Sequence, residues 1–241
     1  MKKLLTSLLL LVFVAVGVNA RTFALITGVS NYGDEELNLA QSTKDAKNFK
    51  DVMETQTKDI TILTSKNVTR ANVLEKLRAI ANRAQKDDTI IFFYAGHGLS
   101  GAMYAYDGLI SYDDIVNVLS KSQAKNKICF IDACQSGSAK DSKKNVDWTQ
   151  SMTGKNDMAF MVACRPNEGS AEHAFVGAGY FTQALVKGLR GKSDKNRDKK
   201  ITLIELFKYV YGDVVKRSKE EQHPQLLAPN SMYDIVVAQW K

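Results

Sequence analysis

Two reactive side chains, an imidazole and a thiol, stand in glycine-bounded loops near the middle of the chain. His97 lies between two glycines shortly after the apolar run at residues 90–95, and Cys134 follows the apolar run at residues 128–131. Buried strands of parallel sheets end at a common carboxyl edge, where they present catalytic groups. The pattern therefore predicts a cysteine nucleophile whose proton is managed by a histidine, the minimal apparatus for acyl transfer.

The remaining cysteines and histidines suggest no competing site. Cys129 and Cys164 lie in or at the end of apolar runs, where a buried and inert thiol is the usual outcome. His173 and His223 have no cysteine nearby at the spacing of zinc ligands. We therefore expect no zinc site and no disulfide scaffold, and Cys134 is the expected reactive thiol because it lies in a loop.

Strand-like runs alternate with amphipathic helical segments along the chain. The strand-like runs are residues 23–27, 60–63, 89–94, 127–131, 158–163 and 233–238. Thr69 is a good N-cap for a helix whose apolar positions recur at three- and four-residue spacing, Ser111 opens another helix, and residues 203–219 form a long amphipathic one. The alternation predicts an α/β fold with a mainly parallel sheet and helices on both faces.

The first 20 residues have the character of an export signal. Lys2 and Lys3 precede an uncharged stretch at residues 4–18, and the sequence Val-Asn-Ala at residues 18–20 fits the small-residue pattern before a signal-peptidase cut. A membrane anchor is the alternative, but the apolar stretch is shorter than the roughly 20 residues that a spanning helix needs. We expect cleavage after Ala20, an exported protein that is periplasmic or secreted, and no membrane span afterwards.

The rest of the chain, residues 21–241, has a length that suits one α/β domain. Its charge is the full-chain value of +7 less the two leader lysines, which gives +5. This modest charge, without a basic stripe interleaved with aromatic residues, indicates a solvated surface rather than nucleic-acid binding. Residues 137–157 are rich in Ser, Lys, Asp and Asn, and they predict an exposed, mobile loop directly after the expected nucleophile.

The residues around the histidine and the thiol resemble the motifs of caspase-like cysteine peptidases, most closely those of the bacterial metacaspase-like branch. Tyr94-Ala95-Gly96-His97-Gly98 is paired with Asp132-Ala133-Cys134-Gln135-Ser136-Gly137, and further similarity lies in residues 45–46, 162–172 and 179–185. An aspartate stands where the local caspase signature has glutamine, which favours the metacaspase-like branch. The resemblance implies a three-layer caspase-like fold with a mainly parallel six-stranded sheet.

The same resemblance implies peptide-bond hydrolysis through a thioester. Cys134 would attack the scissile carbonyl, and His97 would protonate the leaving amine and then assist the deacylating water. The main-chain amides of Gly98 and Cys134 would hold the oxyanion. The sequence shows no sign of a third, orienting carboxylate, and the resemblance does not require one.

Substrate preference follows from two carboxylates. In metacaspase-like relatives, an aspartate two residues before the nucleophile and another on the first helix line the primary specificity pocket, and Asp132 and Asp45 match these positions. Such a pocket favours a cation and repels an acidic side chain. The resemblance therefore implies cleavage of proteins or peptides after Arg or Lys, and not after Asp. For Asp45, a solvated helix-surface residue is the alternative.

The polar loop at residues 137–157 raises the hypothesis of self-cleavage. It contains Lys140, Lys143, Lys144 and Lys155, in the segment where family members are often nicked. The alternative is a lysine-rich loop that is simply soluble.

The expected dyad requires no cofactor, and calcium is the one candidate ligand. Asp194, Asn196, Asp198 and Glu205 occupy the first, third, fifth and twelfth positions of a calcium-loop pattern. Lys199 takes the sixth position, where the pattern wants glycine, and the added lysines oppose a dication. The alternative is a polar turn that caps the following helix.

Two other functional classes stay open. One is a caspase-like fold that serves without catalysis as a binding or regulatory module, against which the presence of His97 and Cys134 argues. The other is a thiol amidase or transpeptidase that acts on small substrates or cell-wall peptides, which would need only the same dyad.

Overall fold

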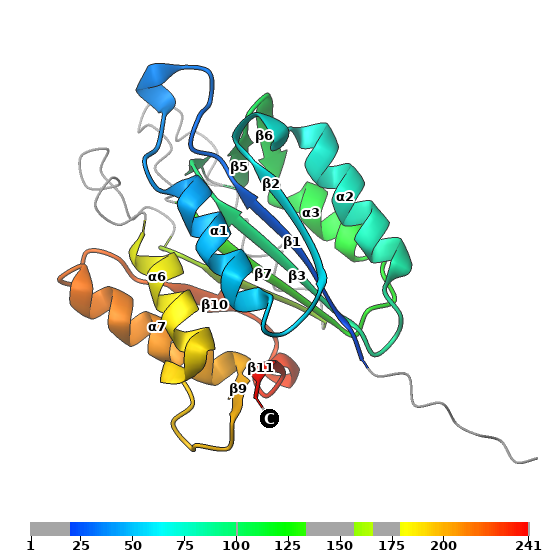
Figure 1. Ribbon diagram of the computed structural model, residues 1–241, viewed down its shortest axis with the longest axis vertical. Coiled ribbons are helices and arrows are strands. Elements are labelled where there is room, and N and C mark those ends of the chain that lie inside the picture. Colours follow the sequence, from blue (N-terminus) through cyan, green and yellow to red (C-terminus); the bar gives the residue numbers. More distant parts are fainter. Residues whose placement is uncertain (1–19, 100, 134–156, 166–178, 241) are drawn as a thin grey trace, which may run out of the picture.

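A computed structural model describes residues 20–99, 101–133, 157–165 and 179–240. Cys134, the four loop lysines and His173 lie outside the described residues. The main sheet has six strands in the order β10-β8-β7-β3-β1-β2 (Figure 1). They are β1 (Thr22–Gly28), β2 (Asp59–Thr64), β3 (Thr89–Ala95), β7 (Asn126–Asp132), β8 (Met158–Val162) and β10 (Gln225–Leu227). All neighbours are parallel except β10, which runs antiparallel to β8.

The central strands are buried on both faces, which explains their continuous apolar runs. In β1, β3 and β7 every residue after the first is buried, as expected for parallel strands covered by helices on each side. Successive side chains enter opposite cores: Phe23 and Leu25 pack in one cluster, and Ala24 and Ile26 in the other.

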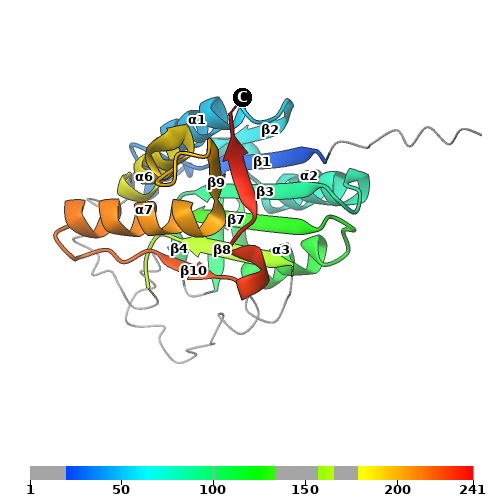
Figure 2. The same cartoon turned by 90° about the horizontal axis from the view of Figure 1, so that it is seen from below.

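Helices cover both faces of the sheet and complete a three-layer α/β fold, as predicted. They are α1 (Ser42–Met53), α2 (Arg70–Arg83), α3 (Tyr112–Leu119), α6 (Tyr180–Lys187) and α7 (Leu203–Arg217), with the short turns η1 (Glu35–Leu37), η2 (Ser65–Asn67), η3 (Gly188–Lys192) and η4 (Asn230–Met232). Helices α2 and α3 lie on one face, and α1, α6 and α7 lie on the other (Figures 1 and 2). No helix in the described part of the chain is long and apolar enough to cross a bilayer.

The predicted helix starts are confirmed. The side chain of Thr69 accepts a hydrogen bond from Asn72 N at the start of α2. Ser111 and Asp114 form a capping box at the start of α3. The long helix that begins at Leu203 ends at Arg217, two residues earlier than the predicted segment.

The sixth strand of the main sheet is not the run at residues 233–238. That run contributes β11 (Val236–Gln239), which pairs with β9 (Lys200–Thr202) in a separate two-stranded sheet. The edge position goes instead to β10, a half-buried strand of three residues. An edge strand of three residues buries little apolar surface and does not need a long apolar run. The sequence therefore carries no periodic signal for it.

A small three-stranded sheet follows directly after His97, and the sequence did not suggest it. It consists of β4 (Gly98–Leu99), β5 (Ala102–Ala105) and β6 (Gly108–Ser111). Its strands of two to four residues are too short for a period-two pattern to stand out. This sheet fixes the position of the chain directly after His97, because β4 begins at Gly98.

Candidate active site

Two neighbouring parallel strands, β3 and β7, end at the same edge of the sheet. The segment with the histidine follows β3, and the segment that leads to the thiol follows β7. Ala95, the last residue of β3, pairs with Asp132, the last residue of β7. Gly96 N then donates a hydrogen bond to Asp132 O at 3.1 Å. His97 comes two residues after Ala95, and Cys134 comes two residues after Asp132. The two sequence positions therefore have the same offset from one paired register, on strands that lie about 4.8 Å apart.

The imidazole of His97 is oriented by a main-chain carbonyl. Its Nε2 lies 2.8 Å from the carbonyl oxygen of Leu37, the last residue of η1. A carbonyl oxygen can only accept, so Nε2 carries the hydrogen, and Nδ1 of the neutral ring keeps a lone pair that can take a proton. Asp34 caps η1 by accepting from Glu36 N, which fixes this segment. Sequence reasoning missed this contact, because a carbonyl is present at every residue and carries no residue-type signal.

Three tyrosines surround the loop that carries the histidine. His97 N donates to the hydroxyl of Tyr32 at 2.8 Å, and the two rings lie 5.1 Å apart. The Tyr104 ring stands edge-on to the imidazole at 6.4 Å. The hydroxyl of Tyr94 lies 2.7 Å from the carbonyl oxygens of both His97 and Tyr104. Burial raises the pKa of Tyr94 well above its usual value, so this hydroxyl stays a neutral donor.

Asp132 and Asp45 are both buried near the carboxyl edge of the sheet, and they lie close enough for the charge of Asp132 to raise the pKa of Asp45. Asp132 ends β7 and is 6% exposed, while Asp45 lies in the first turn of α1 and is 4% exposed. Oδ2 of Asp132 accepts hydrogen bonds from Thr182 Oγ1 at 2.5 Å and from Thr182 N at 3.2 Å, in the first turn of α6. The burial of Asp45 replaces the alternative of a solvated surface residue. Thr182 is a further site residue that the sequence did not single out.

Burial makes both of these carboxyl groups harder to ionise. Burial, together with the nearby charge of Asp132, raises the pKa of Asp45 to about 7, and Lys44 opposes this shift. Burial also raises the pKa of Asp132 to about 6, against the hydrogen bonds from Thr182. Among the described residues, neither carboxylate has an ion-pair partner. A cationic guest would supply the missing counter-charge.

The other residues predicted around the dyad lie as follows. Gly98 is buried in β4, directly after the histidine. Cys129 and Cys164 are buried, as predicted, and burial raises the pKa of Cys129. Cys164 Sγ contacts the carbonyl oxygen of Ala133 at 3.7 Å. Both cysteines are therefore part of the packed interior of the protein.

The candidate calcium loop is held by hydrogen bonds of its own. Carboxylate oxygens of Asp194 and Asp198 accept from main-chain N–H groups within the loop, and Glu205 accepts from Thr202 in a capping box at the start of α7. Lys199, at the glycine position, adopts a left-handed φ of 64°. The described residues contain no cluster of three or more His, Cys, Asp or Glu side chains placed to hold a metal. Calcium binding stays a prediction.

The chain belongs to the family of caspase-domain peptidases, because the family model described as "Caspase domain" matches residues 21–232. A protein from Geobacter sulfurreducens solved by structural genomics is similar in fold, with a TM-score of 0.65 and 20% identity over 92% of this chain and 100% of that one. Caspase-1 from Spodoptera frugiperda is similar with a TM-score of 0.64 and 17% identity, over 91% of this chain and 92% of that one. No functionally curated protein sequence matches the chain significantly.

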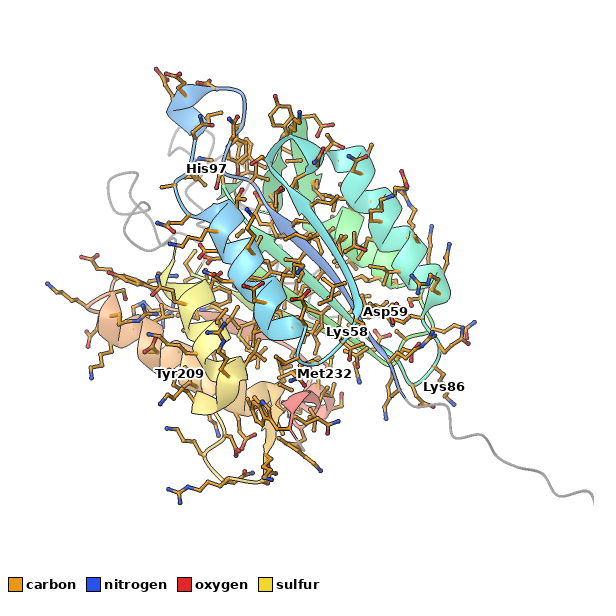
Figure 3. The ribbon with its side chains drawn as sticks, in the orientation of Figure 1. Lys58, Asp59, Lys86, His97, Tyr209 and Met232 are labelled. Carbon is orange, nitrogen blue, oxygen red and sulfur yellow. The ribbon has the colours of Figure 1, made fainter. Side chains whose placement is uncertain are left out.

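Membership of this family indicates a cysteine peptidase with protein substrates. The two structural similarities support the caspase-like fold. The histidine that the sequence singled out lies at the carboxyl edge of the sheet, and Asp59 and Lys86 lie at the opposite end (Figure 3). This edge is where open α/β sheets bind and transform their ligands.

A substitution at Gly96 can test the role of the tyrosine cage, which we define as Tyr32, Tyr94 and Tyr104 around the His97 loop. A Cβ added at Gly96 would overlap the Tyr94 hydroxyl and stand 2.7 Å from the Tyr32 hydroxyl. We expect Gly96→Ala to displace the histidine loop and lower kcat/KM for peptide hydrolysis by about 100-fold, the usual cost of misplacing a reacting group by about 1 Å. Peptidase kinetics and a thermal melt measure the two effects.

The matched control for this change is Gly212→Ala. Gly212 lies within α7, and a Cβ there would meet no atom within 4 Å. This variant should keep full activity and gain up to about 1 kcal/mol of stability from helix propensity. Full activity of folded Gly96→Ala would contradict the role given to the cage.

Proposed function

We propose that the protein is a metacaspase-like cysteine endopeptidase that cleaves after Arg or Lys. The observation that carries the proposal is the buried pair of Asp45 and Asp132, which stands beneath the strand ends that lead to His97 and Cys134. True caspases select an acidic side chain, which two buried carboxylates would repel. Arginine and lysine supply the charge that this pair lacks, and arginine can bind a carboxylate with two hydrogen bonds.

The chemistry follows from the tautomer of the histidine. Since Nε2–H donates to the Leu37 carbonyl, Nδ1 of His97 takes the proton of the Cys134 thiol. The thiolate adds to the scissile carbonyl, and the amides of Gly98 and Cys134 bind the oxyanion. The intermediate collapses to a thioester as the amine leaves with a proton from His97. Water, deprotonated by His97, then attacks the thioester and releases the acid and the thiol.

The substrate class can be tested with four peptides that differ only in the residue before the scissile bond. We expect hydrolysis with Arg or Lys at that position, at least about 100-fold less with the neutral analogue citrulline, and none with Asp. The assay uses the mature protein, with and without added calcium, and with Cys134→Ala as the blank. Activity confined to the Asp peptide would contradict the proposal.

Two further readouts separate the alternative functions. A chloromethylketone with a basic side chain should label wild type at one site and leave Cys134→Ala unlabelled, whereas a binding module would not react. Digestion of a peptide library should give internal cuts after basic residues, whereas an amidase of small or cell-wall peptides would spare internal bonds. We propose separately that the protein is exported, with leader cleavage after Ala20, and that the peptidase cleaves itself within residues 137–157.

A further inference from the structure

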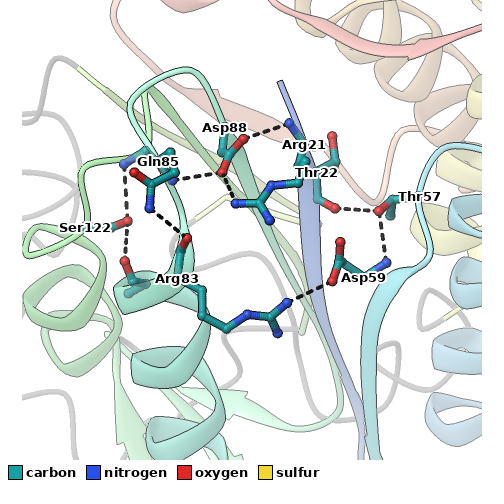
Figure 4. Close-up of polar contacts among 10 residues, drawn as sticks. Arg21, Thr22, Thr57, Asp59, Arg83, Gln85, Asp88 and Ser122 are labelled. Atoms are coloured by element: carbon teal, nitrogen blue, oxygen red, sulfur yellow. Dashed lines mark hydrogen bonds and ion pairs between the residues drawn. The ribbon is translucent and has the colours of Figure 1, made fainter. Parts of the chain in front are cut away.

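A buried carboxylate accepts a hydrogen bond from the main-chain N–H of the residue that follows the predicted leader. Asp88, at the amino end of β3, has a side chain only 1% exposed. Its Oδ1 accepts a hydrogen bond from Arg21 N at 2.8 Å. Its Oδ2 accepts from Gln85 N at 2.8 Å and from the Arg21 guanidinium at 3.2 Å (Figure 4). Burial opposes ionisation, yet these hydrogen bonds hold the pKa of Asp88 below its ordinary value, so the carboxylate is charged.

This contact lies at the opposite end of the sheet from the histidine and has no part in the proposed hydrolysis. Arg21 directly precedes β1, whose first residues pair with the start of β3. Asp88 therefore ties together the amino ends of two adjacent central strands. Arg21 is also the residue directly after the predicted cleavage point, so its nitrogen is the atom that leader removal would change.

We propose that Asp88 is the receptor for the α-ammonium group of the mature chain, which is created at Arg21 when the leader is removed after Ala20. Hydrolysis of the Ala20–Arg21 bond by a leader peptidase consumes one water, leaves a carboxylate on Ala20 and leaves an amine on Arg21 that takes up a proton. The inference rests on the predicted leader and is independent of the proposed peptidase activity.

Processing thereby adds a second positive charge beside the Asp88 carboxylate, which already pairs with the guanidinium of the exposed Arg21 side chain. A full positive charge on the donor adds a Coulombic attraction to the hydrogen bond that the neutral N–H already makes with this carboxylate. Arg21 also lines a cavity of about 690 Å³, which gives the remaining ammonium hydrogens access to water. The other charged groups that line this cavity are Asp59, Asp87, Lys125 and Asp234, of which Asp59 is paired with Arg83 at 3.1 Å. The site as a whole favours an added positive charge.

The test compares two forms of the protein that differ by one residue. One begins at Arg21 and the other retains Ala20, so that in the second form Arg21 N stays a neutral amide. We expect the form that begins at Arg21 to melt about 3 °C higher at pH 7. The pKa of its amine should lie above the ordinary range of about 7.7–8.0, so the added stability is present below that range and is lost as the pH rises through the raised pKa.

Controls identify the receptor and the cleavage point. In Asp88→Asn the one-residue difference in melting should vanish and the amine should titrate normally. If that variant does not fold, the comparison of the two wild-type forms still decides, because it needs no substitution. N-terminal sequencing of the exported protein should begin at Arg21. Equal melting of the two forms, or an exported chain that begins elsewhere, would overturn the inference.

Discussion

Replacing Cys134 or His97 by alanine is expected to lower kcat for basic peptide substrates by roughly 10⁴-fold or more. Each change removes a member of the proposed dyad, and only the binding pocket and the oxyanion-binding amides would continue to accelerate hydrolysis. Because nucleophile and base act as a unit, the double variant should be no slower than either single variant. Steady-state kinetics on the arginine peptide measure all three.

Cys129→Ala is the matched control for the loss of a thiol. Cys129 is fully buried in the same strand that leads to Cys134, and burial raises its pKa, so it is not a nucleophile. The variant should keep kcat/KM within a few-fold and lose about 1 kcal/mol of stability through the removed sulfur. A folded Cys134→Ala variant that still hydrolyses the arginine peptide would rule out the proposed mechanism.

Neutralising the acidic pair is expected to remove the preference for basic substrates. Asp132→Asn or Asp45→Asn should lower kcat/KM for the arginine peptide by about 10- to 100-fold, the value of a buried charged hydrogen bond. The citrulline peptide should change little, because it has the same shape and no charge. Asp51→Asn is the matched control, since Asp51 lies on the same helix as Asp45 but is exposed. An unchanged arginine-to-citrulline ratio in both pocket variants would show that the pair does not bind the substrate.

The same pair predicts how specificity depends on pH. With the pKa of Asp45 raised to about 7 and that of Asp132 raised to about 6, the pocket gains negative charge as the pH rises through this window. The arginine-to-citrulline ratio of kcat/KM should therefore increase between pH 5 and pH 8. Taking the ratio cancels the titration of the dyad, which acts on both peptides alike.

Stability should move in the opposite direction from specificity. Asp45 holds its proton more tightly in the folded chain than in the unfolded chain, where aspartate titrates near 3.9. The free energy of unfolding therefore falls as the pH rises from about 4 to about 7. Asp45→Asn, which is neutral throughout, should be more stable than wild type by roughly 1–3 kcal/mol at pH 8 and equal to it near pH 4. Chemical denaturation at the two pH values measures the difference.

Much of the arrangement was predictable because strong local signals coincide with the core. The continuous apolar runs that lead to His97 and Asp132 are strands buried on both faces, and such strands have few alternatives. Thr69, Ser111 and Thr202 cap helices as their side chains allow. Parallel pairing then brings the ends of adjacent strands to one edge, whatever the intervening helices contain.

The amino-acid sequence by itself determined which side chains could do chemistry here, the elements that carry them and the three-layer class of the fold, because residue type and apolar periodicity are local properties. Only the tertiary structure decided that the Leu37 carbonyl holds the imidazole, that Thr182 binds Asp132, that β10 takes the sheet edge and that Arg21 N reaches Asp88. These contacts use main-chain atoms, or partners 50 or more residues apart. These contacts depend on how the helical connections between the strands pack against the sheet, and the type of a single residue does not predict that packing.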